Sequence, residues 1–413
     1  MKKKFLFAVA IFFLAVAFYS PREASAVPAF ARQTGMACNT CHFQHFPVLN
    51  SFGRAFKAGG YTMVGGQSMV EGDFLSLPAT LNASLVSKVR YQKRNGDDDA
   101  QATNKGELQF PDEAALLIGG RAGEHVGFLI EASLKDGDSR FTSYKMPVVF
   151  DVQNTKLNVI PFSTDAAGTS YGLELLNTGA MKIQRPIEHG PEISAQQYIG
   201  TNTAATGFAF GAVRGIGFVN YTLWYKSHGD AAAGPFLNYI RAAVTPNYMG
   251  WDLALGAQYW GGTSKEGGGA GATTTHAEAW AIDAQAQGMV ADFPVGVYLS
   301  YANAKKSDSA AAADLNIFNN STNKDKSAFA IMAEVGVIPS KLTVSAGYRA
   351  GKDGDANGDG KDSDNATTLA AVYTPIQNLN LQLNYTWYSG EGQLAPTAAT
   401  GDQKATLMVF AAF

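Results

Sequence analysis

Apolar and polar residues alternate along most of this 413-residue chain. From Leu379 to Trp387 the odd positions are apolar and the even positions polar, and Trp251 to Tyr259 follows a similar rule. A period of two predicts β-strands with one apolar and one polar face. About sixteen such strands are expected. They lie near residues 77–93, 107–119, 125–135, 144–152, 156–164, 206–213, 216–226, 236–245, 251–261, 276–288, 293–304, 326–337, 342–350, 366–374, 379–389 and 403–413.

The segments between these strands alternate in length. Tight turns, such as those at 214–215, 338–340 and 375–378, alternate with longer polar loops, with one strand between each turn and the next loop. The longer loops lie near 94–106, 165–205, 227–235, 262–275, 305–325, 351–365 and 390–402. This alternation is typical of bacterial outer-membrane barrels, whose short turns are periplasmic and whose long loops are extracellular. We therefore predict an all-β, antiparallel outer-membrane β-barrel over residues 77–413, embedded in outer-membrane lipid.

Aromatic residues support this interpretation. Trp and Tyr gather towards the strand ends that enter the long loops, as an outer aromatic girdle requires. They are Trp224, Tyr225, Tyr259, Trp260, Tyr298, Tyr301, Tyr348, Trp387 and Tyr388. The chain also ends on a strand whose last residue is Phe413, which resembles the recognition signal of such barrels. A soluble periplasmic sandwich or propeller would explain the alternation, but not the loop asymmetry or the girdle.

The N-terminus predicts export. Three lysines precede an apolar run from Phe5 to Tyr19, and Ala24-Ser25-Ala26 forms an A-x-A cleavage site, so residues 1–26 are expected to be a signal peptide. Its removal takes away four basic side chains and one acidic one, so the net charge of −3 becomes −6. This acidity argues against a nucleic-acid partner. With 44 glycines and 2 cysteines, the chain is no disulfide-framed scaffold.

Both cysteines lie in Cys38-Asn39-Thr40-Cys41-His42, which fits the attachment motif of a c-type haem. Two thiols on one helical turn can form thioethers to the porphyrin, and His42 would then be the proximal ligand of the haem iron. A thioredoxin-like redox pair would need a βαβ context, a zinc site would need two further ligands, and a disulfide leaves His42 unexplained. One covalent haem c is therefore the expected cofactor.

The surrounding residues 27–76 are expected to form a short, partly helical monohaem segment. Its aromatics could wrap the macrocycle, namely Phe43, Phe46, Phe52 and Phe56. Arg54 and Lys57 are candidates to pair with haem propionates, or with acidic groups of the barrel wall. Met63 is the candidate distal ligand, with Met69, His125 or an open sixth position as alternatives. His45 lies three residues after His42 on the same helical face, so it is not expected to reach the opposite side of the porphyrin.

The stretch from Pro28 to Thr62 resembles the N-terminus of the outer-membrane cytochrome–porin fusions, best known as iron oxidases of Fe(II)-oxidising bacteria. The shared pattern comprises Phe30-Ala31-Arg32-Gln33-Thr34-Gly35, the haem motif, Phe46-Pro47, Phe52-Gly53-Arg54 and Phe56-Lys57. Members carry one haem on a short N-terminal segment followed by a barrel of about sixteen strands. This chain departs from the usual spacing by the residues FQH between His42 and Phe46-Pro47.

The resemblance implies an electron conduit of the Fe(II):cytochrome c oxidoreductase type. With the haem segment as a plug in the barrel, extracellular Fe(II) would reduce the haem near the outer mouth, and a periplasmic c-type cytochrome would collect the electron. Two alternatives stay open. Electrons could flow outward to an extracellular acceptor, or the chain could be a solute porin whose haem is structural or sensory.

One long loop has the start of a calcium-binding sequence. Its candidate ligands follow D-x-D-x-N-G with an acid at position twelve, namely Asp353, Asp355, Asn357, Asp359 and Asp364. The twelfth residue is Asp rather than Glu, Lys361 occupies position nine, and strands flank the loop. Ca²⁺ is therefore a secondary prediction beside a solvated acidic loop.

Overall fold

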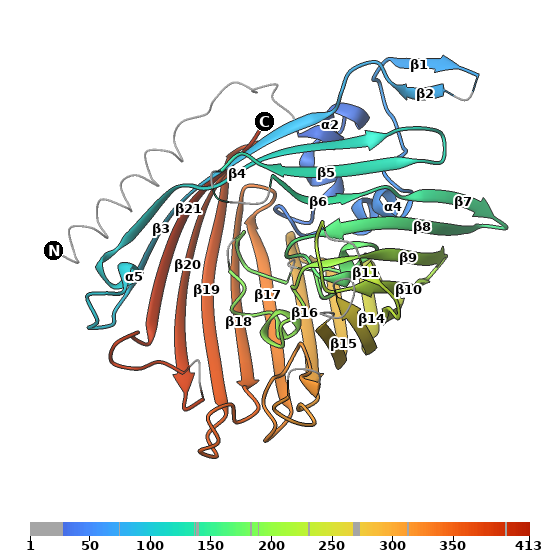
Figure 1. Ribbon diagram of the computed structural model, residues 1–413. Helices are drawn as coiled ribbons and strands as arrows, with labels where there is room; N and C mark the ends of the chain where they lie inside the picture. The colour runs from blue at the N-terminus through green and yellow to red at the C-terminus, as the bar shows by residue number, and fades with distance from the viewer. Residues whose placement is uncertain are drawn as a thin grey trace.

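The computed structural model describes residues 28–413, apart from 74, 136, 138–139, 182–183, 189, 230–231, 267–272, 312–313 and 393–394. The expected signal peptide lies outside the described residues. Over the rest, an antiparallel sheet curves round until the last strand pairs with the first, which makes a closed barrel (Figure 1). The predicted all-β barrel is confirmed.

Sixteen barrel strands are formed by the described residues. Two of them are interrupted: β6 and β7 both pair with β8, and β11, β12 and β13 together fill the place between β10 and β14. The bounds are β3 (Ala83–Arg94), β4 (Glu107–Arg121), β5 (Gly127–Ser133), β6 (Phe141–Lys145), β7 (Val148–Val152), β8 (Thr155–Thr164), β9 (Ala205–Arg214), β10 (Gly217–Tyr225), β11 (Ala232–Ala233), β12 (Leu237–Val244), β13 (Asn247–Tyr248), β14 (Trp251–Glu266), β15 (Thr273–Val290), β16 (Phe293–Ala304), β17 (Lys326–Ile338), β18 (Leu342–Lys352), β19 (Ser363–Ile376), β20 (Leu379–Gly390) and β21 (Gln403–Ala412).

Two strand predictions need correction. The expected strand 144–152 is split at Pro147, because proline cannot donate a hydrogen bond to the ladder. The expected strand 77–93 begins only at Ala83. Leu77 and Pro78 instead belong to a separate hairpin of β1 (Met69–Gly72) and β2 (Leu75–Pro78), which projects from one end of the barrel (Figure 1).

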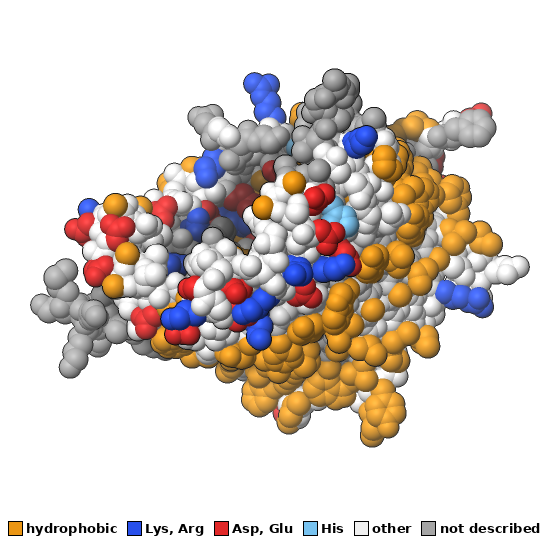
Figure 2. Space-filling view, turned by 60° about the horizontal axis from the view of Figure 1, so that its bottom comes forward, with side chains coloured by type: hydrophobic (Ala, Val, Ile, Leu, Met, Phe, Trp, Pro, Cys, Tyr) orange, Lys and Arg blue, Asp and Glu red, His pale blue; other side chains and the backbone are white. Residues whose placement is uncertain are grey.

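The alternation of the strands is inverted relative to a soluble protein. On β20 the polar residues Asn380, Gln382 and Asn384 are buried towards the lumen, whereas Leu383 and Trp387 are exposed on the outer surface. A broad apolar belt accordingly covers the outside of the barrel in Figure 2, and charged side chains gather at its long-loop end. Such a surface fits a lipid environment.

The aromatic girdle is only partly as predicted. Tyr259, Tyr348 and Trp387 are exposed on the outside. Trp260 and Tyr298 are fully buried and face the lumen instead. Neighbouring residues of a strand point to opposite faces, so Tyr259 and Trp260 cannot both belong to the girdle.

Two segments occupy the lumen. The N-terminal segment (residues 28–66) carries α2 (Ala29–Thr34), α3 (Cys38–Cys41) and α4 (Ser51–Ala58). The inward loop (residues 165–204) carries η1 (Thr169–Tyr171) and α6 (Ala195–Tyr198), and most of its described residues are buried. A further helical turn, α5 (Ala102–Lys105), lies in the first long loop. None of the described helices is long and apolar enough to cross a membrane.

Candidate functional site

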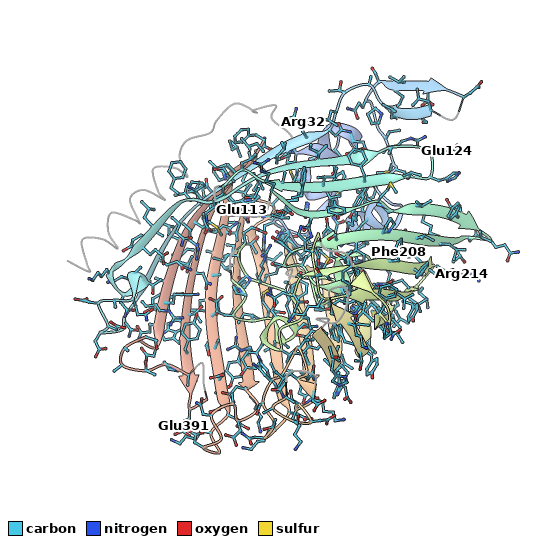
Figure 3. The ribbon with its side chains drawn as sticks, viewed as in Figure 1. Arg32, Glu113, Glu124, Phe208, Arg214 and Glu391 are labelled. Atoms are coloured by element: carbon cyan, nitrogen blue, oxygen red, sulfur yellow. The ribbon has the colours of Figure 1, made fainter. Side chains whose placement is uncertain are left out.

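The haem motif lies at the mouth of the barrel that carries the short turns. Asn39 Nδ2 donates to Ser340 Oγ at 3.5 Å, in the turn between β17 and β18. The Cys38 thiol lies 3.9 Å from the carbonyl oxygen of Gln377, in the turn between β19 and β20. Figure 3 gives the orientation: Arg32 of α2 and Glu124 of the β4–β5 turn mark this end, and Glu391 marks the long-loop end. The motif is thus not at the outer mouth, where we expected Fe(II) to meet the haem.

The two cysteines and the histidine have the local geometry that covalent haem requires. Cys38 and Cys41 begin and end the single turn α3, and both thiols are free. Burial raises the pKa of both thiols, so they are not the low-pKa thiolates typical of redox-active cysteines. This weighs against a thioredoxin-like pair.

His42 is oriented by the backbone. Its Nδ1 lies 3.2 Å from the carbonyl oxygen of Val48, which leaves Nε2 as the ring nitrogen available to a metal. Burial lowers the pKa of His42 to about 4, although the carbonyl of Val48 acts in the opposite sense. The imidazole is therefore neutral near pH 7, which is the form that ligates iron.

A second helix supports the motif. Asn50 caps α4 by accepting from the amide of Gly53 at 2.9 Å, and its own amide donates to the carbonyl of Thr40 at 2.9 Å. A Cβ at Gly53 would lie 2.2 Å from the carbonyl oxygen of Cys41, so only glycine permits this approach. One asparagine and one glycine thus fix α4 against the haem-motif turn.

Apolar surface remains open beside the motif. Phe46 is 39 % exposed and Phe52 is 36 % exposed, although Phe46 also contacts the His42 ring at 5.2 Å between centroids. Its other neighbour is Phe410 of β21, with ring centroids 5.4 Å apart. Two free thiols, a neutral oriented imidazole and exposed aromatic rings are together the donor set and the apolar contacts that a haem c needs. The residues fit the group.

The propionate candidates have other partners. Arg54 is buried and donates to both carboxylate oxygens of Asp252 at 2.7 and 2.6 Å, so it pairs with the barrel wall. This is the second of the two roles that we expected for it. Lys57 is also buried, and its ammonium group lies 3.6 Å from the thioether of Met181. Burial lowers the pKa of Lys57 to about 8.

The structure does not single out a distal ligand. Met63 is exposed, and the hydrogen bond described for it involves its carbonyl, which accepts from Gln33. The ring of His125 stacks on Phe150. Both ring nitrogens of His45 have partners, since Nε2 lies 3.0 Å from Glu334 and Nδ1 lies 2.8 Å from the carbonyl of Phe46. Met63 stays a prediction.

His45 belongs to a network that joins the N-terminal segment to the barrel wall. Glu334 also accepts from the hydroxyl of Tyr298 at 2.6 Å, and Gln287 links Tyr298 to the carbonyl of Leu49. The pKa of His45 is raised: burial acts to lower it, but the hydrogen bond and the charge of Glu334 outweigh that effect. The inserted residues FQH thus supply an anchor that the sequence did not reveal.

The inward loop is fastened to the barrel wall by a buried ion cluster. Arg241 pairs with Glu174 of the loop at 3.1 Å and with Asp283 of β15 at 2.7 Å, and all three side chains are fully buried. Thr178 also donates to Asp283 at 2.7 Å. The loop and the N-terminal segment meet where Asn177 bonds both backbone groups of Leu49. Sequence reasoning treated residues 165–205 as an outer loop and missed this role, because a polar loop carries no signal of its direction.

Some of the predicted calcium ligands already have partners within the protein. Asp364 lies on β19 and accepts from the hydroxyl of Tyr198 in the lumen at 2.9 Å. Asp355 and Asp362 face Lys324 at 3.5 and 3.6 Å, so a lysine already supplies positive charge to the loop. Among the described residues, no three His, Cys, Asp or Glu side chains are placed to hold a metal ion. Ca²⁺ at Asp353, Asp355, Asn357, Asp359 and Asp364 stays a prediction.

Comparison with solved structures finds outer-membrane barrels. OmpTdeltaL8, a loop L8 deletion mutant of the outer membrane protein OmpT of Vibrio cholerae, matches with a TM-score of 0.51 and 13% identity, covering 81% of this chain and 99% of that chain. The in-vitro folded, trimer form of OmpT matches with a TM-score of 0.50 and 11% identity, covering 81% and 99%. The fold is that of an outer-membrane porin. For the outer membrane channel DcaP of Acinetobacter baumannii the TM-score is 0.49 at 11% identity, covering 81% and 97%. Identities this low show the fold alone. The sequence matches no family model and no curated protein.

Proposed function

We propose that this chain is an outer-membrane electron conduit that carries one covalent haem c on its N-terminal segment. The observation that carries the proposal is the joint placement of Cys38, Cys41 and His42 at the short-turn mouth of a porin-fold barrel. In outer-membrane barrels this mouth faces the periplasm. A periplasmic c-type cytochrome could therefore approach the haem directly, and the electron donor on the other side would be extracellular Fe(II).

The chain's residues would hold and shield the group. Cys38 and Cys41 would bind its porphyrin, and the carbonyl of Val48 would keep Nε2 of His42 directed at the iron. Phe46 and Phe52 would supply apolar contacts to the group and help to exclude water. When bound, the haem supplies a site that takes up and releases one electron.

The segments inside the barrel constrain the route of the electron between the extracellular side and the haem. Because the motif is at the periplasmic side, an electron from outside must cross the inward loop, or Fe(II) must diffuse past it through the lumen. Acidic and basic side chains gather at the long-loop end (Figure 2), and the acidic ones can attract a small cation. The same parts also permit outward flow to an extracellular acceptor, since the haem potential decides the direction.

A second candidate function is a solute porin whose haem is structural or sensory. The likeness in fold to outer-membrane porins favours it. The described contacts weigh against it, because both the N-terminal segment and the inward loop are fastened inside the lumen. Liposome swelling with small sugars would show free passage for a porin and slow passage for the conduit.

Spectroscopy on the purified protein tests the main proposal. The chain would be expressed with haem-c maturation and extracted from outer membranes, and pyridine-haemochrome spectra would report covalent haem. Fe(II) added in a stopped-flow instrument should then reduce the haem rapidly. Cys38→Ser should abolish covalent haem, whereas Asn39→Ala, in the same turn, should retain it. A colourless wild-type protein, or haem that Fe(II) does not reduce, would contradict the conduit.

A further inference from the structure

Two buried lysines in the lumen stand apart from the other buried basic residues. Lys57 on α4 is 9 % exposed and Lys145 on β6 is 4 % exposed. Lys88, Arg54, Arg90 and Arg241 each form an ion pair with a carboxylate, and Arg349 donates to two backbone carbonyl oxygens. Within the described residues, neither Lys57 nor Lys145 has an ion pair.

Their described contacts satisfy only part of each ammonium group. Lys145 donates to the carbonyl of Tyr171 at 2.9 Å, and the rings of Tyr171 and Tyr61 lie 4.3 and 5.6 Å from its Nζ. Lys57 has one contact, the weak acceptor Met181 Sδ at 3.6 Å. An ammonium group has three N–H donors, so both lysines keep donors that no described acceptor takes.

The two side chains belong to surfaces that pack together. A Cβ at Gly60, just after α4, would lie 2.6 Å from Val149 and 3.4 Å from Pro147, so the end of this helix rests on the break between β6 and β7. Lys145 is two residues before that break, and its charge interacts with that of Lys57. The carboxylate that acts on Lys57 is Glu174, which is already paired with Arg241 at 3.1 Å.

We propose that Lys57 and Lys145 form a binding site for one oxyanion of the carboxylate or phosphate class. Burial of a cation without a counter-charge is costly, and two such cations close together repel each other. An oxyanion would neutralise both and accept hydrogen bonds from each. The buried hydroxyls of Thr169 and Ser170 in η1, beside Tyr171, have no partner among the described residues and would be further donors.

The anion has two potential sources. One is a haem propionate: Lys57 lies four residues after Gly53, on the face of α4 that touches Cys41. The other is a free anion such as inorganic phosphate. The site does not require haem, and it stands or falls separately from the electron conduit.

Thermal unfolding of the mature chain in detergent tests the site. The wild type and the haem-free double variant Cys38→Ser/Cys41→Ser would be titrated with inorganic phosphate against chloride at equal ionic strength. Phosphate should raise Tm of the haem-free chain by a few degrees. Lys57→Met and Lys145→Met, each placed in the haem-free chain, should abolish the rise. The control Lys341→Met, at an exposed lysine of the same barrel end, should leave it intact. If a Met variant fails to fold, the Arg variants of both lysines should retain the response.

The haem-bearing chain then identifies the source. A phosphate response that disappears when haem is attached assigns the site to a propionate, and one that persists assigns it to a free anion. A haem-free chain whose Tm is indifferent to phosphate would overturn the proposal, because both lysines would then be buried as neutral amines. The proposal would also be overturned if phosphate raised Tm equally in the haem-free chain and in its Lys57→Met and Lys145→Met variants.

Discussion

The N-terminal segment and the inward loop both fill the barrel, yet they are built differently. The inward loop bonds mainly to the barrel wall. Its residues Glu174, Thr178 and Asn177 form ion pairs or hydrogen bonds with buried groups of β12 or β15. The N-terminal segment is also anchored, by Arg54 with Asp252 and by His45 with Glu334. It nevertheless leaves two thiols, one imidazole nitrogen and exposed aromatic rings at the mouth.

The inward loop thus mainly fills the lumen, whereas the N-terminal segment also exposes groups that can bind a ligand. Buried polar groups in proteins are normally satisfied, and many of the inward loop's polar groups find partners in the barrel wall, although the hydroxyls of Thr169 and Ser170 do not. Exposed apolar rings beside free thiols and an oriented imidazole are costly or idle unless something binds there. The contrast therefore supports the proposal that haem binds at the N-terminal segment, with the inward loop as the main filling of the lumen.

Breaking the anchor of the inward loop should have the largest effect. Arg241→Met leaves Glu174 and Asp283 buried without their cation, which should cost about 3–5 kcal/mol of unfolding free energy. The loop should also loosen, so that small sugars enter liposomes faster. Denaturant unfolding and swelling assays would measure both. Arg214→Met, at the exposed end of β9, serves as the control. Equal stability of the two variants would contradict the anchoring role.

Lys57 should make the folded chain more stable as the pH rises above about 8. Its pKa is lowered by burial to about 8, whereas in the unfolded chain it stays near 10.5. Between these values the unfolded chain binds more protons, so the unfolding free energy should rise with pH. The gain from pH 8 to 10.5 is up to about 3 kcal/mol.

Equilibrium unfolding of the haem-free chain at several pH values, compared with Lys57→Met, isolates this contribution. The gain should vanish in the variant. It should also shrink in the presence of phosphate, since a bound anion raises the pKa of Lys57. Parallel pH curves for the two chains would show that Lys57 is not the group responsible.

Gly53→Ala should weaken the haem-motif end of the same segment. The added Cβ would lie 2.2 Å from the carbonyl oxygen of Cys41 and 3.1 Å from the Leu49 side chain, so α4 must move away from α3. We expect a loss of about 1–3 kcal/mol from overpacking, although Ala favours helix by about 1 kcal/mol over Gly. The haem content per chain should fall as well. Gly66→Ala, where nothing lies within 4 Å, should match the wild type in both measurements.

The smallest effect concerns the acidic loop outside both segments. If Ca²⁺ binds at Asp353, Asp355 and Asp359, a chelator should lower Tm of the wild type slightly and leave the triple Asn variant unaffected. Differential scanning calorimetry with and without chelator would measure this. The same chelator response in both proteins would remove the calcium site and leave the ion pairs of Lys324 and the pair Lys361–Glu391 as electrostatic support of the loop.

Part of the candidate site was accessible from the sequence. The spacing of Cys38, Cys41 and His42 alone predicts their joint chemistry, because one helical turn brings them together without help from the rest of the chain. The partners of Arg54, His45 and Glu174 were not accessible. Each partner lies on a strand between 67 and 289 residues away in the sequence. The sequence shows that a polar residue faces the lumen, but it does not show whether water or another segment of the chain lies beside it.

By itself, the sequence determined most of the strands, their number and their apolar and polar faces, because a period of two and the loop lengths are local properties. It also determined the haem motif. Only the tertiary structure decided that residues 165–204 turn inward and that the motif lies at the short-turn mouth. These depend on which distant charges meet inside a closed sheet. Such pairs form, and their mutual attraction offsets the cost of desolvation, only when the closed barrel brings the two charges together.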